Sequence, residues 1–136
     1  MKKTFLDTNI FLRYLTNDDP EKADRVEQLL RKAASGKIVL VTTELVIAEI
    51  VWVLESYYEV DKVRIAEHVR AILATEGLEI INGDLVRRAL EHYLMYNVDF
   101  IDGYIAALMQ KKGITEIFSY DKKHLSRLKA ITRREP

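Results

Sequence analysis

The stretch from Ile38 to Leu54, IVLVTTELVIAEIVWVL, decides the fold of this chain. Its first five residues, IVLVT, are apolar or β-branched throughout, as expected of a strand that is covered on both faces. Thr42 or Thr43 can cap a helix that begins directly afterwards and continues through ESYY at 55–58. A buried strand followed by a long apolar helix is typical of the crossover units of a parallel sheet.

The rest of the chain repeats this alternation of strands and helices. Asp19 followed by Pro20 predicts the start of one helix and Gly36 its end, and Asp61 predicts the cap of another. The expected strands are 3–6, 38–42, 78–81, 115–119 and 130–132. The expected helices are around 10–15, 20–35, 43–58, 61–75, 84–96 and 100–112, with a short helical turn near His124. We therefore expect one domain over 1–136, a three-layer α/β/α fold around a central, mainly parallel sheet of about four to five strands.

The composition excludes several classes of protein. The 136 residues include no Cys, which excludes disulfide scaffolds, thiolate zinc sites and cysteine nucleophiles. The longest apolar stretch, 45–54, is interrupted by Glu49 and has about half the length of a membrane span. Lys2 and Lys3 precede an apolar segment, but Asp7 interrupts it and no small-residue cleavage site follows. We expect a soluble, cytoplasmic protein with no membrane contact.

Charge is distributed unevenly along the chain, although the formal net charge is zero. Residues 111–136 hold eight basic side chains against three acidic ones. This segment is either an ordinary solvated surface or a phosphate-binding rim beside an acidic centre. The candidates for contact with a nucleic acid are Lys111, Lys112, Lys122, Lys123 and Arg127.

Three carboxylates interrupt apolar runs: Asp7, Glu49 and Asp102. The helix around Glu49 has no polar face, so we expect this side chain to be at least partly buried. No Lys or Arg lies close to any of the three in the sequence, and a buried charge requires compensation. A structural salt bridge from a distant basic residue remains an alternative for Glu49, and helix capping is one for Asp7 and Asp102.

Topology brings these acids to one edge of the predicted sheet. Asp7 ends the first strand and Asp121 follows the strand at 115–119, so both belong to carboxyl ends, where α/β proteins form ligand sites. Glu49 and Asp102 lie near the starts of helices on the same side. Asp99, one turn before Asp102, could bind a metal or cap its helix. Such a set predicts a hard, oxygen-ligated cation, Mg²⁺ or alternatively Mn²⁺.

The three histidines add nothing to this set. His68, His92 and His124 lie in or beside helical stretches, with no spacing that suits a pair of ligands. We expect all three to be ordinary surface or boundary residues.

Four motifs resemble those of the PIN-domain nucleases. They are LDTN at 6–9, a single Glu within an apolar helix, DFIDGYIAAL at 99–108 and FSYD at 118–121. The resemblance extends in order and spacing over essentially the whole chain. The pattern is most similar to that of the small ribonucleases that act as toxins in VapBC toxin-antitoxin pairs.

The resemblance implies a function and a set of site residues. By it, Asp7, Glu49, Asp102 and Asp121 form the catalytic, metal-binding set, and Thr8, Asn9 and Ser119 support them. It also implies divalent-metal-dependent endonucleolytic cleavage of RNA, a homodimer, and an antitoxin that blocks the site. Gly103 departs from the family pattern, where a helix former such as Ala is common, and could loosen the helix start by up to about 1 kcal/mol.

Three other readings remain open. A phosphoacceptor signalling domain also has a parallel sheet and an acidic magnesium pocket, but it ordinarily has paired acids after the first strand, where LDTN offers one. A non-catalytic interaction module would use the acids as helix caps and the apolar helix at 44–58 to bind a partner. A housekeeping PIN-type ribonuclease would share the chemistry and differ only in its context.

Overall fold

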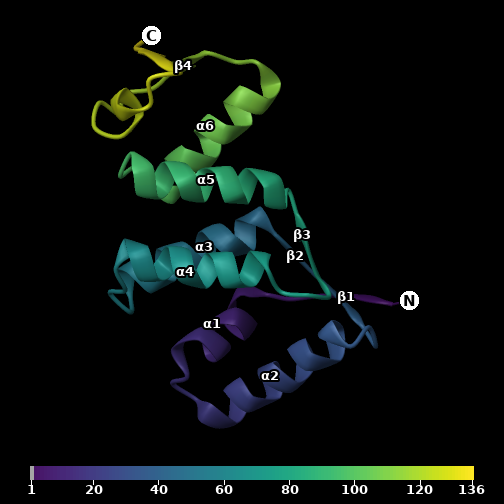
Figure 1. Cartoon of the computed structure of the whole chain (residues 1–136). Coiled ribbons are helices and arrows are strands. Elements are labelled where there is room, and N and C mark those ends of the chain that lie inside the picture. The colour runs from purple at the N-terminus through teal and green to yellow at the C-terminus, as the bar shows by residue number, and fades with distance from the viewer. Residues whose placement is uncertain (1) are drawn as a thin grey trace. The chain divides into compact units, whose positions relative to one another are not determined.

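The computed structural model describes residues 2–136, which form two compact units that meet in sequence at Gly83 and Asp84 (Figure 1). The first unit contains β1 (Lys3–Phe5), α1 (Thr8–Thr16), α2 (Pro20–Ala34), β2 (Val39–Thr43), α3 (Glu44–Ser56), α4 (Lys62–Leu73) and β3 (Leu78–Ile81). The second contains α5 (Gly83–Met95), which starts at the boundary, α6 (Phe100–Lys112), β4 (Glu116–Phe118), the 3₁₀ helix η1 (Leu125–Arg127) and β5 (Thr132–Arg134).

The sheet of the first unit has the order β1-β2-β3, and all of its strands are parallel. The central strand β2 is anchored by Leu40 and Thr42, both fully buried. The Thr42 hydroxyl donates to the Leu6 carbonyl at 3.1 Å, and the Leu6 N–H donates to the Val41 carbonyl at 2.8 Å. These bonds hold the chain against β2 beyond the end of β1, so that Asp7 follows directly at the carboxyl edge.

Helix starts in this unit follow the sequence signals. The Asp19 carboxylate accepts from the Lys22 N–H at 3.2 Å with Pro20 in the first helical position, and the Asp61 carboxylate accepts from the Arg64 N–H at 3.0 Å. Both predicted caps are confirmed. Helix α1 packs on α2 and α3, and α3 packs on α4. The core includes the fully buried Ile47 and Ile50 of α3.

The second unit contains a parallel pair of strands, with Ile117 of β4 opposite Arg133 of β5. Its apolar cluster consists of Val98, Ala106, Met109, Leu125, Leu128 and Ile131. The last strand begins two residues later than predicted because the buried Ile131 still belongs to a turn, in which its N–H donates to the Leu128 carbonyl at 3.1 Å.

The expected α/β class with parallel strands is confirmed. Five strands are present in residues 2–136, and their hydrogen bonds form one three-stranded and one two-stranded sheet. Over the same residues, each helix is too short or too polar to cross a membrane.

Gly77 is required by a close approach of two chain segments in the first unit. Its φ is +83°, and a Cβ atom there would overlap the carbonyl group of Ala33 at the end of α2. Gly36 has a similar φ of +82°, but nothing lies within 4 Å of the position that its Cβ would occupy. Both glycines have the left-handed backbone that would strain a larger residue, and they differ in the space available for a side chain.

We expect Gly36→Ala to lower the free energy of unfolding by about 1–2 kcal/mol, because only the left-handed backbone disfavours a side chain there. Gly77→Ala should lower it by a further 1–3 kcal/mol or so, because the backbone of Ala33 must also move. Urea unfolding of both variants measures the difference. Equal losses would show that the approach of Gly77 to α2 is less tight than described.

Candidate functional site

The start of α6 carries two carboxylates on one side of the helix. Asp99 occupies the N-cap position with an extended backbone, and Asp102 lies in the first turn. The Asp99 side chain makes no capping hydrogen bond, so capping through its carboxylate does not occur. Residues three apart lie on the same face of a helix, and the positive end of the helix dipole favours carboxylates there.

The loop after β4 presents a third carboxylate, that of Asp121. The Ser119 hydroxyl accepts from the Asp121 N–H at 3.0 Å. One oxygen of Asp121, Oδ1, accepts from the N–H groups of Lys123 at 2.9 Å and of His124 at 3.2 Å. The sequence S-Y-D therefore folds into a tight turn that fixes the carboxylate of Asp121 and begins the segment containing His124.

These three carboxylates, which we call the acidic cluster (Asp99, Asp102 and Asp121), surround His124. The His124 Nδ1 lies 3.4 Å from Oδ2 of Asp102, 3.5 Å from that of Asp99 and 3.8 Å from that of Asp121. His124 lies at the boundary of the protein, as predicted, but its proximity to three carboxylates was not expected from the sequence. The signal that was missed is its spacing of three residues after Asp121, which returns its side chain to the same turn.

The surroundings of the acidic cluster disfavour the charged form of Asp102. Burial raises the pKa of Asp102, and the charges of Asp121 and Asp99 raise it further. The pKa of Asp121 is lowered, chiefly by the hydrogen bond from the His124 N–H. Ligand atoms of Asp99, Asp102 and His124 all lie within 4.8 Å of one another. Carboxylates at this spacing, in an environment that penalises their charge, fit a divalent cation, which would offset the repulsion.

In the first unit, Asp7 is exposed and caps α1. Its Oδ1 accepts from the Thr8 N–H at 2.8 Å. Asp7 is therefore a helix cap, which was the alternative function considered for it, and its Oδ2 takes no part in the capping hydrogen bond. Thr8 is buried and Asn9 is exposed.

Glu49 is exposed, and the prediction that it is at least partly buried is wrong. The reason is that apolar residues of α3 extend around the whole helix. Leu45 and Trp52 lie on the same stripe as Glu49 and are 75% and 66% exposed. An apolar sequence around a carboxylate did not imply an apolar environment.

The basic residues that were predicted to contact a nucleic acid differ in whether their side chains already have a partner in the protein. Lys111 pairs with Asp84 at 3.3 Å, Lys122 lies 4.0 Å from Glu135, and the Arg127 guanidinium donates to the Asn97 carbonyl. Lys112 and Lys123 are exposed. These two lysines have side chains available to contact a phosphate.

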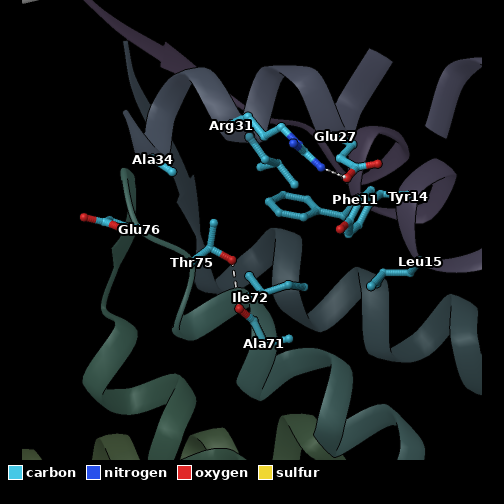
Figure 2. A pocket seen from close by; sticks show the side chains of 11 residues that line it. Phe11, Tyr14, Leu15, Glu27, Arg31, Ala34, Ala71, Ile72, Thr75 and Glu76 are labelled. Atoms are coloured by element: carbon cyan, nitrogen blue, oxygen red, sulfur yellow. Dashed lines mark hydrogen bonds and ion pairs between the residues drawn. The ribbon is translucent and has the colours of Figure 1, made fainter. Parts of the chain in front are cut away.

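A cavity of about 380 Å³ in the first unit lies between α1, α2 and the end of α4 (Figure 2). Phe11, Leu15 and Ile72 give it an apolar lining. Two of the charged residues that line it are paired with each other, since Arg31 donates to Glu27 at 2.8 Å (Figure 2). None of the predicted site residues lines this cavity, so we place the candidate functional site at the acidic residues.

A family model and a sequence relative agree with the sequence resemblance. The model of the PIN domain family matches residues 4–131. A VapC ribonuclease of Aquifex aeolicus (strain VF5) is 29% identical over 118 residues, which are 87% of each chain. The crystal structure of VapC20 of Mycobacterium tuberculosis, titled a sarcin-ricin loop cleaving toxin, is 20% identical, with a TM-score of 0.40 over 90% of this chain and 93% of that one.

Gly103, directly after Asp102, lies where α6 closely approaches α5. A Cβ atom there would lie 2.8 Å from the Ala89 carbonyl oxygen and 3.2 Å from the Cβ of His92. The His92 Nδ1 lies 3.1 Å from the Gly103 carbonyl oxygen. The glycine that was expected to loosen the helix start is thus the residue that allows this packing.

Gly103→Ala should therefore lower the free energy of unfolding by about 1–3 kcal/mol, because the clash with α5 exceeds the gain in helix propensity. Thermal and urea unfolding test this expectation. Gly83→Ala, where the added Cβ meets its nearest atom at 3.5 Å, is the matched control and should change stability little. Stabilisation by Gly103→Ala would contradict the close packing of α5 and α6.

Proposed function

Since the chain belongs to the PIN-domain family, we propose that it is a divalent-metal-dependent endoribonuclease and the toxin of a VapBC-type toxin-antitoxin pair, acting in the cytoplasm. The observation that carries the proposal is the acidic cluster at the start of α6, in which burial and neighbouring charges raise the pKa of Asp102. The name of the Aquifex aeolicus relative, VapC ribonuclease, supports the choice of RNA as substrate.

In this proposal, the family resemblance makes Asp7, Glu49, Asp102 and Asp121 the metal ligands, for Mg²⁺ or alternatively Mn²⁺. When bound, such a cation stabilises negative charge on the phosphoryl oxygens and promotes ionisation of water. Asp99 is an additional candidate ligand. Thr8, Asn9 and Ser119 are proposed to support the carboxylates, as Ser119 does through its hydrogen bond with the Asp121 N–H.

The chain's own side chains have two further roles in the proposed hydrolysis. Glu49 is exposed, so its carboxylate is free to orient a water molecule or to accept its proton. Lys112 and Lys123 are exposed and are proposed to contact phosphates that flank the cleaved bond. Lys111, Lys122 and Arg127 can add to this contact by exchanging their present partners for phosphate.

Asp7→Asn should reduce cleavage of a mixed RNA pool by about 100-fold or more, since loss of residues that merely support a metal ligand already costs about 10–100-fold. The Asn side chain can still accept from the Thr8 N–H, so the variant should fold at least as stably as the wild type without metal. The matched control is Asp61→Asn, which removes the same charge from the cap of α4. Cleavage is measured with Mg²⁺, Mn²⁺ or EDTA, beside thermal melts.

Cleavage by Asp7→Asn at the wild-type rate, or wild-type cleavage that persists in EDTA, would overturn the mechanism. Calorimetric titration with Mn²⁺ tests whether Asp7 and Asp102 share one cation. If they do, the titration shows one bound ion, and Asp7→Asn and Asp102→Asn each weaken its binding. If each unit held a separate ion, Asp7→Asn would abolish the binding of one ion and leave the binding of the other unchanged.

We further propose a homodimer formed through the apolar surfaces of α3 and α4. Trp52 of α3 and Val63 of α4 are 66% and 64% exposed, and large apolar side chains exposed on packed helices are candidates for an association surface. We expect light scattering at micromolar concentration to give the mass of a dimer, and Trp52→Glu with Val63→Lys to give that of a monomer. Ile114→Lys, at a residue 51% exposed in the second unit, is the control. A monomeric wild type with and without metal would contradict the proposal.

A toxin and a housekeeping ribonuclease would carry out the same chemistry and would differ in whether a neighbouring reading frame encodes an antitoxin. A toxin should arrest growth when it is expressed alone, and co-expression of a small neighbouring reading frame should restore growth. A housekeeping ribonuclease should cleave RNA without such a neighbour. A non-catalytic interaction module should neither cleave RNA nor bind a divalent cation.

A further inference from the structure

The position of His124 within the acidic cluster is set by packing and by hydrogen bonds. The backbone N–H of His124 donates to Oδ1 of Asp121. The next residue, Leu125, is 2% exposed and packs in the apolar cluster of the second unit. The His124 side chain is itself only 19% exposed. The imidazole is therefore held on the side of the turn that faces α6, whereas a histidine free in solvent would point away from it.

The distances around the His124 Nδ1 do not describe an ordinary hydrogen bond. An N–H donor lies 2.7–3.2 Å or so from its acceptor. All three carboxylate oxygens around this nitrogen are farther away, at 3.4, 3.5 and 3.8 Å. The nitrogen is shared among three acceptors and bonds closely with none of them.

The same distances lie between the two spacings that the ligands of one octahedral ion have. Ligand atoms that each lie about 2.1 Å from an octahedral ion are about 3.0 Å apart as neighbours and about 4.2 Å apart across the ion. The contacts of the His124 Nδ1 fall between these limits. Only small side-chain movements would allow one cation to replace the three long contacts.

We propose that the His124 Nδ1 is a ligand of the site's divalent cation, and that it makes the site prefer first-row transition ions such as Mn²⁺ to Mg²⁺. The inference rests on the proposed function, from which the cation comes. Carboxylates and water suit Mg²⁺, whereas an imidazole nitrogen is a softer ligand that transition ions accept more readily.

The competing explanation is that His124 is a structural counter-ion, which offsets the charge of the acidic cluster and moves aside when metal binds. The two explanations predict opposite effects. Removing a ligand weakens metal binding, and more so for Mn²⁺ than for Mg²⁺. Removing a competing positive group leaves both affinities unchanged or raises them.

The experiment uses the full chain without RNA and titrates it with MnCl₂ or MgCl₂ in a calorimeter. We expect His124→Ala to weaken Mn²⁺ binding by about 10-fold or more and Mg²⁺ binding by less than about three-fold. His68→Ala, in α4, is the matched control and should change neither affinity. Circular dichroism establishes that each variant is folded.

Pulsed electron paramagnetic resonance of Mn²⁺ bound to the wild type gives a second readout that needs no variant. Coupling to an imidazole nitrogen should be present in the wild type and in His68→Ala and absent in His124→Ala. Mn²⁺ binding without such coupling, or an unchanged ratio of Mn²⁺ to Mg²⁺ affinity in His124→Ala, would overturn this inference and leave the proposed nuclease intact. A wild type that binds neither ion would overturn both.

Discussion

Repulsion between carboxylates at the start of α6 is the constraint on which the candidate site depends. Burial and the charges of Asp99 and Asp121 raise the pKa of Asp102, so holding these groups together costs free energy. The surrounding structure offsets this cost in several ways. The α6 dipole favours negative charge at its first turn, and the turn after β4 gives the Asp121 carboxylate two N–H donors. The His124 Nδ1 lies within 4 Å of all three carboxylates.

Much of the fold could be predicted because its signals are local. The caps at Asp19 and Asp61 and the helix over 100–112 depend on neighbouring residues, and the structure agrees with all three. The resemblance to the PIN-domain family is likewise confirmed, since the family model matches residues 4–131. The ends of the last strand were less predictable, because the packing of Ile131 decides where it starts.

The errors at the candidate site arise where the outcome depends on packing between elements. Glu49 has apolar neighbours in sequence, but the partner that would cover its stripe of α3 is not specified by the helix itself, and the side chain is exposed. His124 has no histidine or cysteine at ligand spacing, and it meets Asp99 and Asp102 only because Leu125 anchors its turn in the core. Gly103 counts as a weak helix former by propensity, yet the approach of α5 leaves no room for a side chain.

The hydrogen bonds that the carboxylates of Asp7 and Asp121 accept also bear on how these two groups could bind a metal ion. Asp7 uses Oδ1 to accept from the Thr8 N–H, and Asp121 uses Oδ1 to accept from two N–H groups. Each retains Oδ2, and for Asp121 this is the oxygen that faces His124. Each acid can therefore offer Oδ2 to a cation while its Oδ1 keeps its hydrogen bonds. A cation held through one oxygen of each proposed acidic ligand would have room left for water and for a phosphate oxygen, as a catalytic metal site requires.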